Sequence, residues 1–406
     1  MAIPYSRPGA RARNQINNRY DVLIDRSIES MERAPMACVL RIQTISTKPF
    51  QPTNHNVTPA RARHHARRPA PMPKISALVT YPVKSCAGVS LDAVALTSTG
   101  LAFDRVWSVV HAKDGKFISQ RTHPRLALVS CAIDPPEAYT NATIRRFTLT
   151  CEAKSMDRAL KVEVDLDAKS SANALSQTEC WDWLGTCANE GGTAEKWFSE
   201  FLNQDESGRG ESYALVRWLG RGGFPGGAQD EDVGVDVDDA TTRLTSENYG
   251  SRRCTTTLSD GYPMLLVNQS SIDALDAMVR PTTRVDGRRF RGNVVVDDAP
   301  AYAEDRWASI QISQDIHAEL CKPCSRCTIP AVDPDTGSTE HGDAVARALA
   351  QTRGGAALGT SNRFWRACTF FGWNLIVPAL PRADQGMKIL RVGDIVDVTS
   401  HRDAFP

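Results

Sequence analysis

Three cysteines fall within seven residues of this chain, in the segment Cys321-Lys-Pro-Cys324-Ser-Arg-Cys327. A turn of Asp, Pro, Asp, Thr and Gly follows directly at 333–337. Thiolates are soft metal ligands and strong nucleophiles. The cluster therefore indicates metal or sulfur chemistry, and the first question is how many of the three thiols take part in it.

The three cysteines have three alternative interpretations. A structural zinc site is one, because Cys-x2-Cys is a common zinc half-site, but neither Cys368 nor His341 comes in a matching second pair. An iron–sulfur cluster of the bacterial type needs a cysteine and a proline where this chain has Ala331 and Val332, which excludes it. The third use is one catalytic or metal-bound thiolate with two bystanders, since free cysteines often pack as small hydrophobes.

The composition is that of an ordinary globular protein. Its 406 residues, 41% hydrophobic and 23% charged, suffice for one large or two medium domains. A formal net charge of +1 gives no global attraction to nucleic acid or to an anionic membrane. No stretch approaches the ~18 apolar residues of a transmembrane helix. The odd number of cysteines, 11, and their irregular spacing favour a reducing intracellular compartment over a disulfide framework.

Residues 1–73 differ in composition from the rest. They carry twelve Arg or Lys residues against four acids and show no sustained hydrophobic period, which indicates a disordered basic extension. An arginine-rich, acid-poor leader is also typical of a mitochondrial presequence. A further alternative is an overlong start whose true first residue is Met72. We therefore expect a mitochondrial location, and otherwise a cytoplasmic one.

Short strands separated by turns dominate from Lys74 onward, which predicts a barrel or sandwich and not alternating β/α units. The predicted strands are 74–81, 94–96, 105–110, 126–130, 146–151, 160–164, 213–218, 290–296, 310–312, 375–377 and 389–398, the last with a turn at 392–394. Helices are predicted at 193–203, capped by Thr193, and at 270–278. The Gly-rich and acidic stretch 219–240 predicts a solvated insertion loop.

The thiol motif belongs to a longer ordered set. It reads Pro-Cys-Ser-Arg-Cys at 323–327 and Val-Asp-Pro-Asp-Thr-Gly at 332–337. The other motifs are Tyr-Pro-Val-Lys-Ser-Cys-Ala-Gly at 81–88, Gly-Leu-Ala-Phe-Asp-Arg-Val-Trp at 100–107, Gln-Arg at 120–121, Ser-Asp-Gly-Tyr-Pro at 259–263 and Arg-Phe-Arg-Gly-Asn at 289–293. Taken in this order, the set resembles the MOSC family, and more closely its branch of mitochondrial amidoxime-reducing components.

The resemblance implies a fold and a site. The fold is mixed β with some α: an N-terminal β-barrel-like domain over 74–205 and a β-barrel MOSC domain over 206–403. In that family the second thiol of the Cys-x-x-Cys unit, here Cys327, is the protein ligand of molybdenum in Mo-molybdopterin. The resemblance implies a catalytic role for Asp260 beside it. The implied cofactor-binding residues are Lys84, Ser85, Arg105, Tyr262, Arg291, Asn293 and Ser325.

These residue types suit an anionic pterin that carries a phosphate. Arginine presents a planar fork to phosphate, and asparagine donates and accepts at once. Lys322 and Arg326 would favour the thiolate form of Cys327. Taken singly, a lysine or arginine is more often a solvated surface charge, and Arg291 could pair with Asp286. Three tryptophans of the motifs are expected in the core: Trp107, Trp197 and Trp307.

One position departs from the family pattern, which has a proline between the Arg and the Asn of the Arg-x-Asn block. This chain has Gly292 there. Because glycine loosens the backbone, we expect the aim of Asn293 to be less fixed.

The resemblance implies an oxidoreductase that reduces small N-hydroxylated compounds. No flavin, nicotinamide or haem motif is found, so the electrons must come from elsewhere, by resemblance from cytochrome b5 and its NADH-dependent reductase. The alternative is a stand-alone sulfur-carrier or cofactor-binding module, related to the C-terminal part of molybdenum cofactor sulfurases. The pyridoxal-phosphate domain of a complete sulfurase has no room in this chain.

Overall fold

The computed structural model describes residues 72–167, 174–205, 210–220, 222–226, 240–245, 249–379 and 386–406. The expected extension over 1–73 lies outside this part of the chain except for its last two residues, and so does most of the expected loop at 219–240. The first strand begins at Lys74, where the sequence predicts it.

The larger sheet has eight strands in the order β18-β14-β15-β16-β12-β13-β1-β2. Their bounds are β18 Val396–His401, β14 Trp307–Ile312, β15 Ile316–Ser325, β16 Phe370–Ile376, β12 Met264–Asn268, β13 Val294–Asp297, β1 Lys74–Thr80 and β2 Val89–Leu91. Strands β12 and β13 run parallel, whereas β1 and β13 run antiparallel with a register shift between Ile75 and Ala77. The sheet thus joins the first strand of the chain to its C-terminal half.

Three smaller sheets hold most of the N-terminal half. The first, in the order β5-β11-β10-β9, contains β5 Trp107–His111, β11 Tyr213–Trp218, β10 Trp183–Asn189 and β9 Leu175–Cys180. The second contains β6 Ser130–Asp134, β7 Arg146–Glu152 and β8 Leu160–Asp165. The third, in the order β17-β3-β4, contains β17 Ile389–Arg391, β3 Ala93–Thr97 and β4 Gly100–Leu101. Alternating burial along β7 and β8 shows why they form: one face carries apolar residues and packs inward.

Helices are few in the described chain. The α-helices are α2 Gly192–Leu202, α3 Gln269–Val279, α4 Gly342–Arg353 and α5 Gly355–Leu358. The 3-10 turns are η1 Pro124–Leu128, η2 Pro136–Tyr139, η3 Gly287–Arg289, η4 Ala303–Arg306, η5 Ile329–Ala331 and η6 Trp365–Ala367. Helix α2 buries Trp197, Phe198 and Phe201 as one apolar face.

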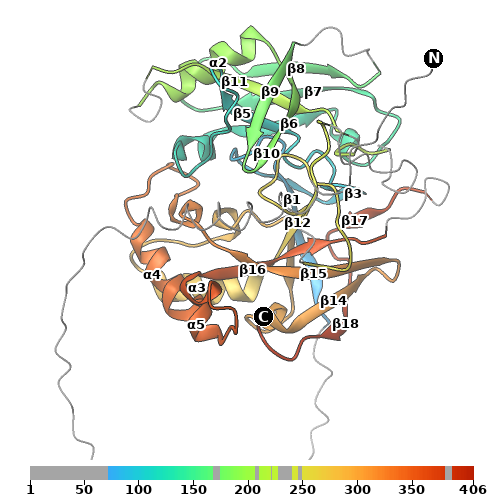
Figure 1. Ribbon diagram of the computed structural model, residues 1–406, viewed down its shortest axis with the longest axis vertical. Helices are drawn as coiled ribbons and strands as arrows, with labels where there is room; N and C mark the ends of the chain where they lie inside the picture. Colours follow the sequence, from blue (N-terminus) through green and yellow to red (C-terminus); the bar gives the residue numbers. More distant parts are fainter. Residues whose placement is uncertain are drawn as a thin grey trace, which may run out of the picture. The chain divides into compact units, whose positions relative to one another are not determined.

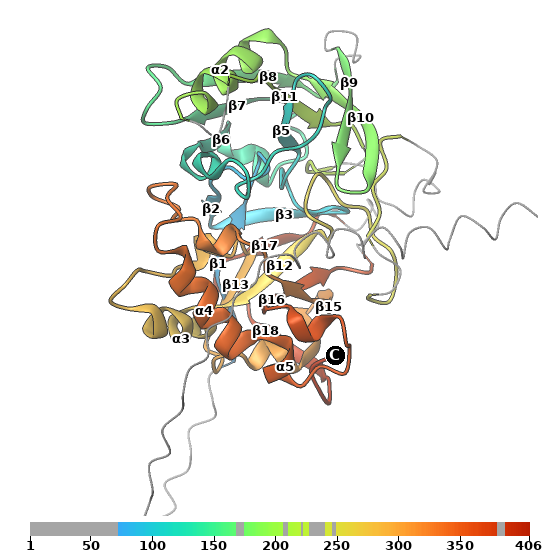
Figure 2. The ribbon, with the colours of Figure 1, turned by 60° about the vertical axis from the view of Figure 1, so that its left-hand side comes forward.

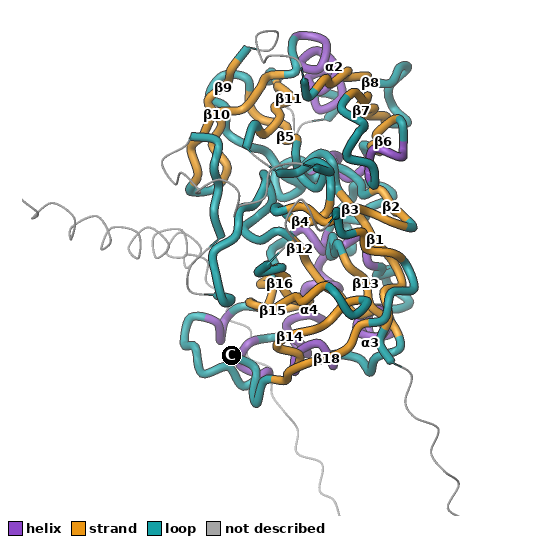
Figure 3. The backbone as a smooth tube through the Cα atoms, turned by 90° about the vertical axis from the view of Figure 1, so that its right-hand side faces the viewer, coloured by secondary structure: helices purple, strands orange, loops and turns teal. Residues whose placement is uncertain are grey.

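The elements gather into two groups (Figure 1). The β5 and β6 sheets lie with α2 at one end, and the eight-stranded sheet lies with α3, α4 and α5 at the other. Figure 2 shows α3 and α4 beside the larger sheet, where their apolar residues pack with Val267 and Phe371. Loop segments are dense between the two groups (Figure 3). These loops carry the residues of the site described below.

The architecture is mostly β, with sheets curled as half-barrels, which confirms the predicted fold class. The predicted strands at 213–218 and 146–151 are present, and the three motif tryptophans are buried. The structure also contains a hairpin, β9 and β10, that the sequence analysis missed.

Three local predictions were wrong. The segment predicted as a strand at 126–130 begins as the 3-10 turn η1, because Pro124 presets a helical φ at its start. The segment predicted as a strand at 290–296 is extended only from Val294, because Arg291 has a left-handed φ of 57°. Helix α2 starts at Gly192 with Gly191 as its N-cap, so Thr193 lies inside its first turn.

Candidate functional site

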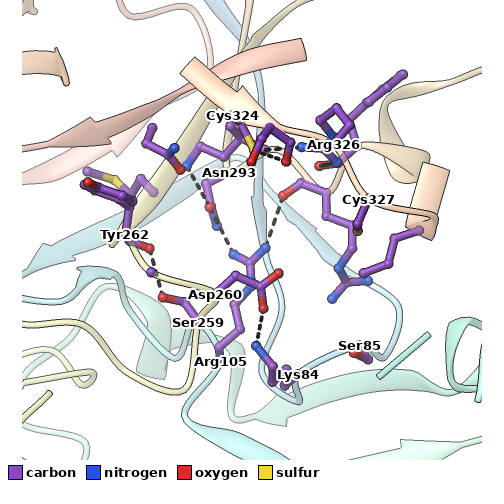
Figure 4. Close-up of a pocket in the computed structure, with 18 of the residues that line it drawn as sticks. Lys84, Ser85, Arg105, Ser259, Asp260, Tyr262, Asn293, Cys324, Arg326 and Cys327 are labelled. Carbon is purple, nitrogen blue, oxygen red and sulfur yellow. Dashed lines mark hydrogen bonds and ion pairs between the residues drawn. The ribbon is translucent and has the colours of Figure 1, made fainter. Parts of the chain in front are cut away.

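A pocket gathers the residues that the motifs place far apart in sequence (Figure 4). Lys84 and Ser85 come from the loop after β1, and Arg105 comes from the turn before β5. The other lining residues singled out from the sequence are Asp260, Tyr262, Arg291, Asn293, Ser325 and Cys327. The structure therefore brings together every predicted site residue, in a cavity of about 110 Å³.

Asp260 is the centre of a charged network at this pocket. Its carboxylate forms a short ion pair with Lys84, which is buried, and a second ion pair with Arg121 at 3.2 Å. The indole Nε1 of Trp181 donates to the same carboxylate at 3.4 Å. Three side chains from the N-terminal half thus converge on one acid from the C-terminal half.

The protonation of Asp260 follows from these neighbours. Partial burial opposes ionisation of the carboxyl, but the charges of Lys84 and Arg121 and the hydrogen bond from Lys84 outweigh it and hold its pKa well below the usual range. Asp260 is therefore an anion at neutral pH, although 55% of its side chain is exposed. A general-acid role is closed to it in this state.

The loop that carries Asp260 is held from behind by Arg243. This buried guanidinium donates to the carbonyl of Thr257 at 3.0 Å and to that of Ser259 at 2.5 Å. The Ser259 hydroxyl in turn donates to the carbonyl of Tyr262 at 2.9 Å. Asp260 and Tyr262 therefore enter the pocket on a loop whose backbone is fixed by a cation.

Asn293 and Arg105 are joined in a second network. The amide of Asn293 donates to Asp104 at 2.9 Å and to the carbonyl of Val79 at 3.1 Å. Its oxygen accepts from Arg105 at 3.0 Å and from the Leu265 N–H at 3.1 Å. The side chain of Asn293 thus uses its two donors and its oxygen on protein groups, which makes it a positioning residue in this structure. Its role as a direct cofactor ligand stays a prediction.

The expected looseness at Gly292 is not what the structure shows. A Cβ at this position would lie 2.7 Å from Cγ2 of Val267, so the close packing of two chain segments requires glycine here. Asn293 is anchored through its side chain, as above, and its backbone N–H donates to the carbonyl of Leu265 at 2.8 Å. These bonds fix the aim of Asn293.

Arg105 and Arg291 both stack on Tyr81. Their guanidinium carbons lie 4.3 and 4.2 Å from the ring centre. Burial lowers the pKa of Arg291, and the like charge of Arg105 lowers it further. Nη1 of Arg291 donates to the carbonyl of Cys86 at 2.7 Å, while Nη2 is buried without a partner among the described residues. Asp286, the alternative partner, pairs with Arg288.

Three residues that line this pocket have an unusual backbone conformation. Ser85, Arg105 and Arg291 have φ angles of 69°, 48° and 57°, in the left-handed region that side chains other than glycine rarely adopt. Such conformations cost about 1–3 kcal/mol each and persist where surrounding contacts over-determine them, often at functional sites. The strain aims these three side chains at one cavity.

The three cysteines of the motif have different surroundings. Cys321 donates to the carbonyl of Asn374, and burial raises the pKa of its thiol to about 12. Cys324 accepts a hydrogen bond from Arg326 at 3.0 Å. Cys327 is exposed just beyond the end of β15 and lines the pocket. Within the described ranges, no three His, Cys, Asp or Glu side chains are grouped so as to hold a metal ion.

Arg121 is the main pocket residue to which the sequence analysis assigned no role. Burial lowers the pKa of its guanidinium, but the charges of Asp260 and Cys327, with which it also forms hydrogen bonds, raise it above the usual value. The ring of Trp181 lies 4.7 Å from the same guanidinium. The Gln-Arg motif at 120–121 was the available signal, whereas Trp181 stands in a hairpin that no motif marked.

The turn at 333–337 is tied to the Arg-Phe-Arg-Gly-Asn block. Arg289 is buried and pairs with Asp333 at 2.8 Å, and it donates to the carbonyl of Val332 at 2.8 Å. The carboxylate of Asp333 also accepts from the N–H groups of Asp335 and Thr336. Arg289 thus fixes the loop that follows Cys327 to the segment that carries Arg291.

The donor set suits an anionic group bound through a thiolate. Two guanidinium nitrogens, Nη2 of Arg291 and Nε of Arg326, are buried without a partner in the described chain. An unpartnered buried donor is unfavourable unless a ligand completes it. The hydroxyl of Tyr262 is likewise buried without a partner among the described residues, and Cys327 supplies a soft ligand in the same pocket. These residues therefore fit a molybdenum-bearing pterin phosphate.

The fold and pocket define a β-rich protein with a thiol and a cluster of cationic side chains in a pocket between two groups of sheets. Residues 72–205 match the MOSC N-terminal beta barrel domain, and residues 254–397 match the MOSC domain. The two matches together cover more than half of the chain, which therefore belongs to the MOSC family.

Two groups of relatives are similar to this chain in sequence. A molybdenum cofactor sulfurase of Botryotinia fuckeliana is 26% identical over 80% of this chain, but the chain spans only 41% of that relative. Mitochondrial amidoxime-reducing component 1 of mouse is 27% identical over 66% of this chain and 68% of the relative. Human mitochondrial amidoxime reducing component 2 is 28% identical over 65% of this chain and 68% of the relative. No described helix has the length and apolar character needed to cross a membrane.

Proposed function

We propose that the pocket holds the molybdenum cofactor, with Cys327 as the protein ligand of the metal, and that the protein reduces N-hydroxylated compounds there. The observation that carries the proposal is that one pocket holds both an exposed thiol and a buried guanidinium nitrogen of Arg291 that has no partner among the described residues. A metal-bearing pterin with a phosphate needs a soft ligand at one end and a cation at the other.

The pocket residues divide into two roles in this proposal. Arg291 donates to the phosphate through Nη2, and Ser85, Tyr262 and Ser325 supply hydrogen bonds to the group. Lys84 adds positive charge. Arg105 and Asn293 act on one another and on the Arg291 backbone, whose carbonyl accepts from Arg105 at 3.1 Å. They hold the cradle in shape, so their loss would loosen the site without removing a ligand.

The bound cofactor supplies two-electron redox chemistry at molybdenum. Conversion of an N–OH group to N–H consumes two electrons and two protons and releases water. Asp260 is ionised at neutral pH, so its role in this proposal is to accept a hydrogen bond from the substrate's N–H group and to hold Lys84 and Arg121 in place. The indole of Trp181, 42% exposed, lies beside this carboxylate.

Electron supply and location belong to the same proposal. We expect cytochrome b5 and its NADH-dependent reductase as donors, and a mitochondrial location. Support comes from the relatives that are named mitochondrial amidoxime-reducing components. A reporter fused behind residues 1–73 tests the location, and a diffuse cytosolic signal would count against it.

Metal analysis tests the proposal directly. The wild type, Cys327→Ser and Cys324→Ser are produced in a host that makes the cofactor, and molybdenum per chain is measured. We expect near-stoichiometric metal in the wild type, at least about tenfold less in Cys327→Ser, and a minor change in Cys324→Ser, because only Cys327 is both exposed and pocket-lining. Hydroxylamine-dependent NADH oxidation with added cytochrome b5 and reductase then tests the reaction.

A second candidate is a sulfur-carrier or cofactor-binding module. It is favoured by the sulfurase relatives, one of which aligns with 80% of this chain, and by the contact of Cys324 with Arg326, which suits an anionic sulfur. Mass spectrometry of the purified protein separates the two. A metal-free chain with one extra sulfur on Cys324 or Cys327 would favour the carrier and overturn the reductase.

A further inference from the structure

A second group of thiols lies outside the pocket, in the N-terminal half. Cys131 on β6 stands directly opposite Cys151 on β7, in a register that also pairs Ile133 with Leu149. Opposed residues of antiparallel strands present their side chains on the same face, with Cα atoms about 4.5–5.5 Å apart. That separation lies within the range of about 4.4–6.8 Å found for disulfides. The register thus gives the two cysteines a Cα separation that permits a disulfide.

A third thiol completes the group. Cys86 follows Lys84 and Ser85 in the loop after β1, and its thiol is hydrogen-bonded to that of Cys131. Cys86 and Cys151 are fully buried, whereas Cys131 is only partly covered. Cys131 is thus the member of the group whose residue keeps some exposed surface, so a small reagent would approach the group from its side.

The central thiol is the one that its surroundings favour as a thiolate. Hydrogen bonds from Cys151 and Cys86 hold the pKa of Cys131 well below the usual value, and the charge of Arg291 acts in the same direction. The pKa of Cys151 is raised by its hydrogen bond to Cys131 and by burial, and the pKa of Cys86 is raised mainly by burial. Nucleophilic attack on an oxidant therefore falls to Cys131, with the Cys151 thiol beside it to resolve the product.

We propose that Cys131 and Cys151 form a peroxide-sensitive oxidation site that closes to a disulfide. The Cys131 thiolate attacks one oxygen of hydrogen peroxide, the O–O bond breaks, and sulfenic acid and hydroxide form; the hydroxide takes up a proton to become water. The Cys151 sulfur then attacks the sulfenic sulfur, the S–S bond forms, and a second water leaves with the thiol proton. Two thiols are oxidised by two electrons, and one peroxide is reduced to two waters.

The site has a direct connection to the pocket. The Cys86 carbonyl accepts the hydrogen bond that anchors Arg291, at 2.7 Å. In the oxidised form the Cys131 sulfur is bonded to Cys151, so the thiol of Cys86 loses its hydrogen-bond partner. The oxidation chemistry itself holds whichever ligand the pocket takes, so it stands or falls independently of the proposed reductase.

Peptide mapping tests the disulfide. Trypsin separates the three thiols, because Cys86, Cys131 and Cys151 fall in the peptides 85–105, 126–145 and 147–154. After brief treatment of the full-length protein with hydrogen peroxide and blocking of free thiols, we expect peptide 126–145 linked to 147–154. A link between 126–145 and 85–105 instead, or no link with Cys131 still reduced, would overturn the pairing.

Reactivity provides the second arm. Dimedone captures sulfenic acids, and Cys368 serves as an internal control, because it is also partly exposed but burial raises the pKa of its thiol. In Cys151→Ser, where no disulfide can consume the sulfenic acid, we expect the Cys131 adduct to form at least about tenfold faster than the Cys368 adduct, since one pKa unit changes the thiolate fraction tenfold. Cys151→Ser should increase that adduct by trapping the sulfenic acid, whereas Cys187→Ser, a change at another buried strand thiol, should leave it unchanged. Equal labelling of Cys131 and Cys368 in Cys151→Ser would contradict the proposal.

Discussion

Nη2 of Arg121 lies 3.2 Å from Oδ2 of Asp260, and this ion pair joins two residues that are 139 positions apart in the chain. Arg121 belongs to the loop after β5, and Asp260 belongs to the loop before β12. The same guanidinium interacts with Cys327. One arginine from the MOSC N-terminal domain therefore contacts both the acid and the thiol that the MOSC domain supplies.

Removal of the Asp260 charge should destabilise the fold in a pH-dependent way. The folded state holds the pKa of Asp260 below its usual 3.8, so ionisation favours folding above that pH, and the benefit is lost as the pH falls through the folded-state pKa. Asp260→Asn should lower the free energy of unfolding by about 1 kcal/mol, a value reduced by solvent screening of the exposed carboxylate. Urea unfolding should show a constant difference from pH 8 to 5. A difference that grew as the pH fell below about 4 would contradict this assignment.

Arg291→Met should separate ligand binding from stability. Loss of an incompletely partnered buried cation should change the free energy of unfolding by no more than about 1 kcal/mol, because the hydrogen bond to Cys86 is lost but burial of a charge is relieved. Molybdenum content should fall at least about tenfold. Arg288→Met is the control, since Arg288 is exposed and already paired with Asp286 and Asp335. Equal metal loss in both variants would remove Arg291 from the site.

Gly292→Ala should destabilise the protein through a single close contact. The new Cβ would lie 2.7 Å from Cγ2 of Val267, a buried β-branched side chain with little freedom to move. We expect a loss of about 1–3 kcal/mol in the free energy of unfolding, as for overpacked cores. In Val267→Ala the same glycine substitution should have a much smaller effect. Additive losses in the double variant would show that the contact is not the cause.

Asp333→Ala should weaken the loop that follows Cys327. The buried guanidinium of Arg289 would lose its acid partner, at a cost of about 1–3 kcal/mol for a charged hydrogen bond. Asp335→Ala, which removes an exposed partner of Arg288, should cost less than about 1 kcal/mol. Thermal melts of the two variants measure the contrast. Similar melting temperatures would mean that Arg289 does not depend on Asp333.

Much of the fold was open to prediction from local patterns. The alternation of apolar residues along β7 and β8 predicts their alternating burial, and the apolar stripe of α2 predicts its buried face. Leu126 and its neighbours were assigned to a strand on apolar content alone, which does not distinguish a strand from a 3-10 turn behind a proline. The hairpin of β9 and β10 escaped because Gly185 and polar residues interrupt its pattern.

The sequence by itself determined the chemistry that is available: a thiol motif, a set of cations and an ordered series of family motifs. Only the tertiary structure decided which groups remain free. Asn293 and Arg105 carry the right chemistry but hydrogen-bond to one another, whereas Nη2 of Arg291 has no partner in the part of the chain that the structure describes. The pairing of Cys131 with Cys151 and of Arg121 with Asp260 likewise depends on strand register and loop packing. The physical reason is that hydrogen bonds and ion pairs act over a few ångströms, and residues far apart in sequence reach that distance only in the folded chain.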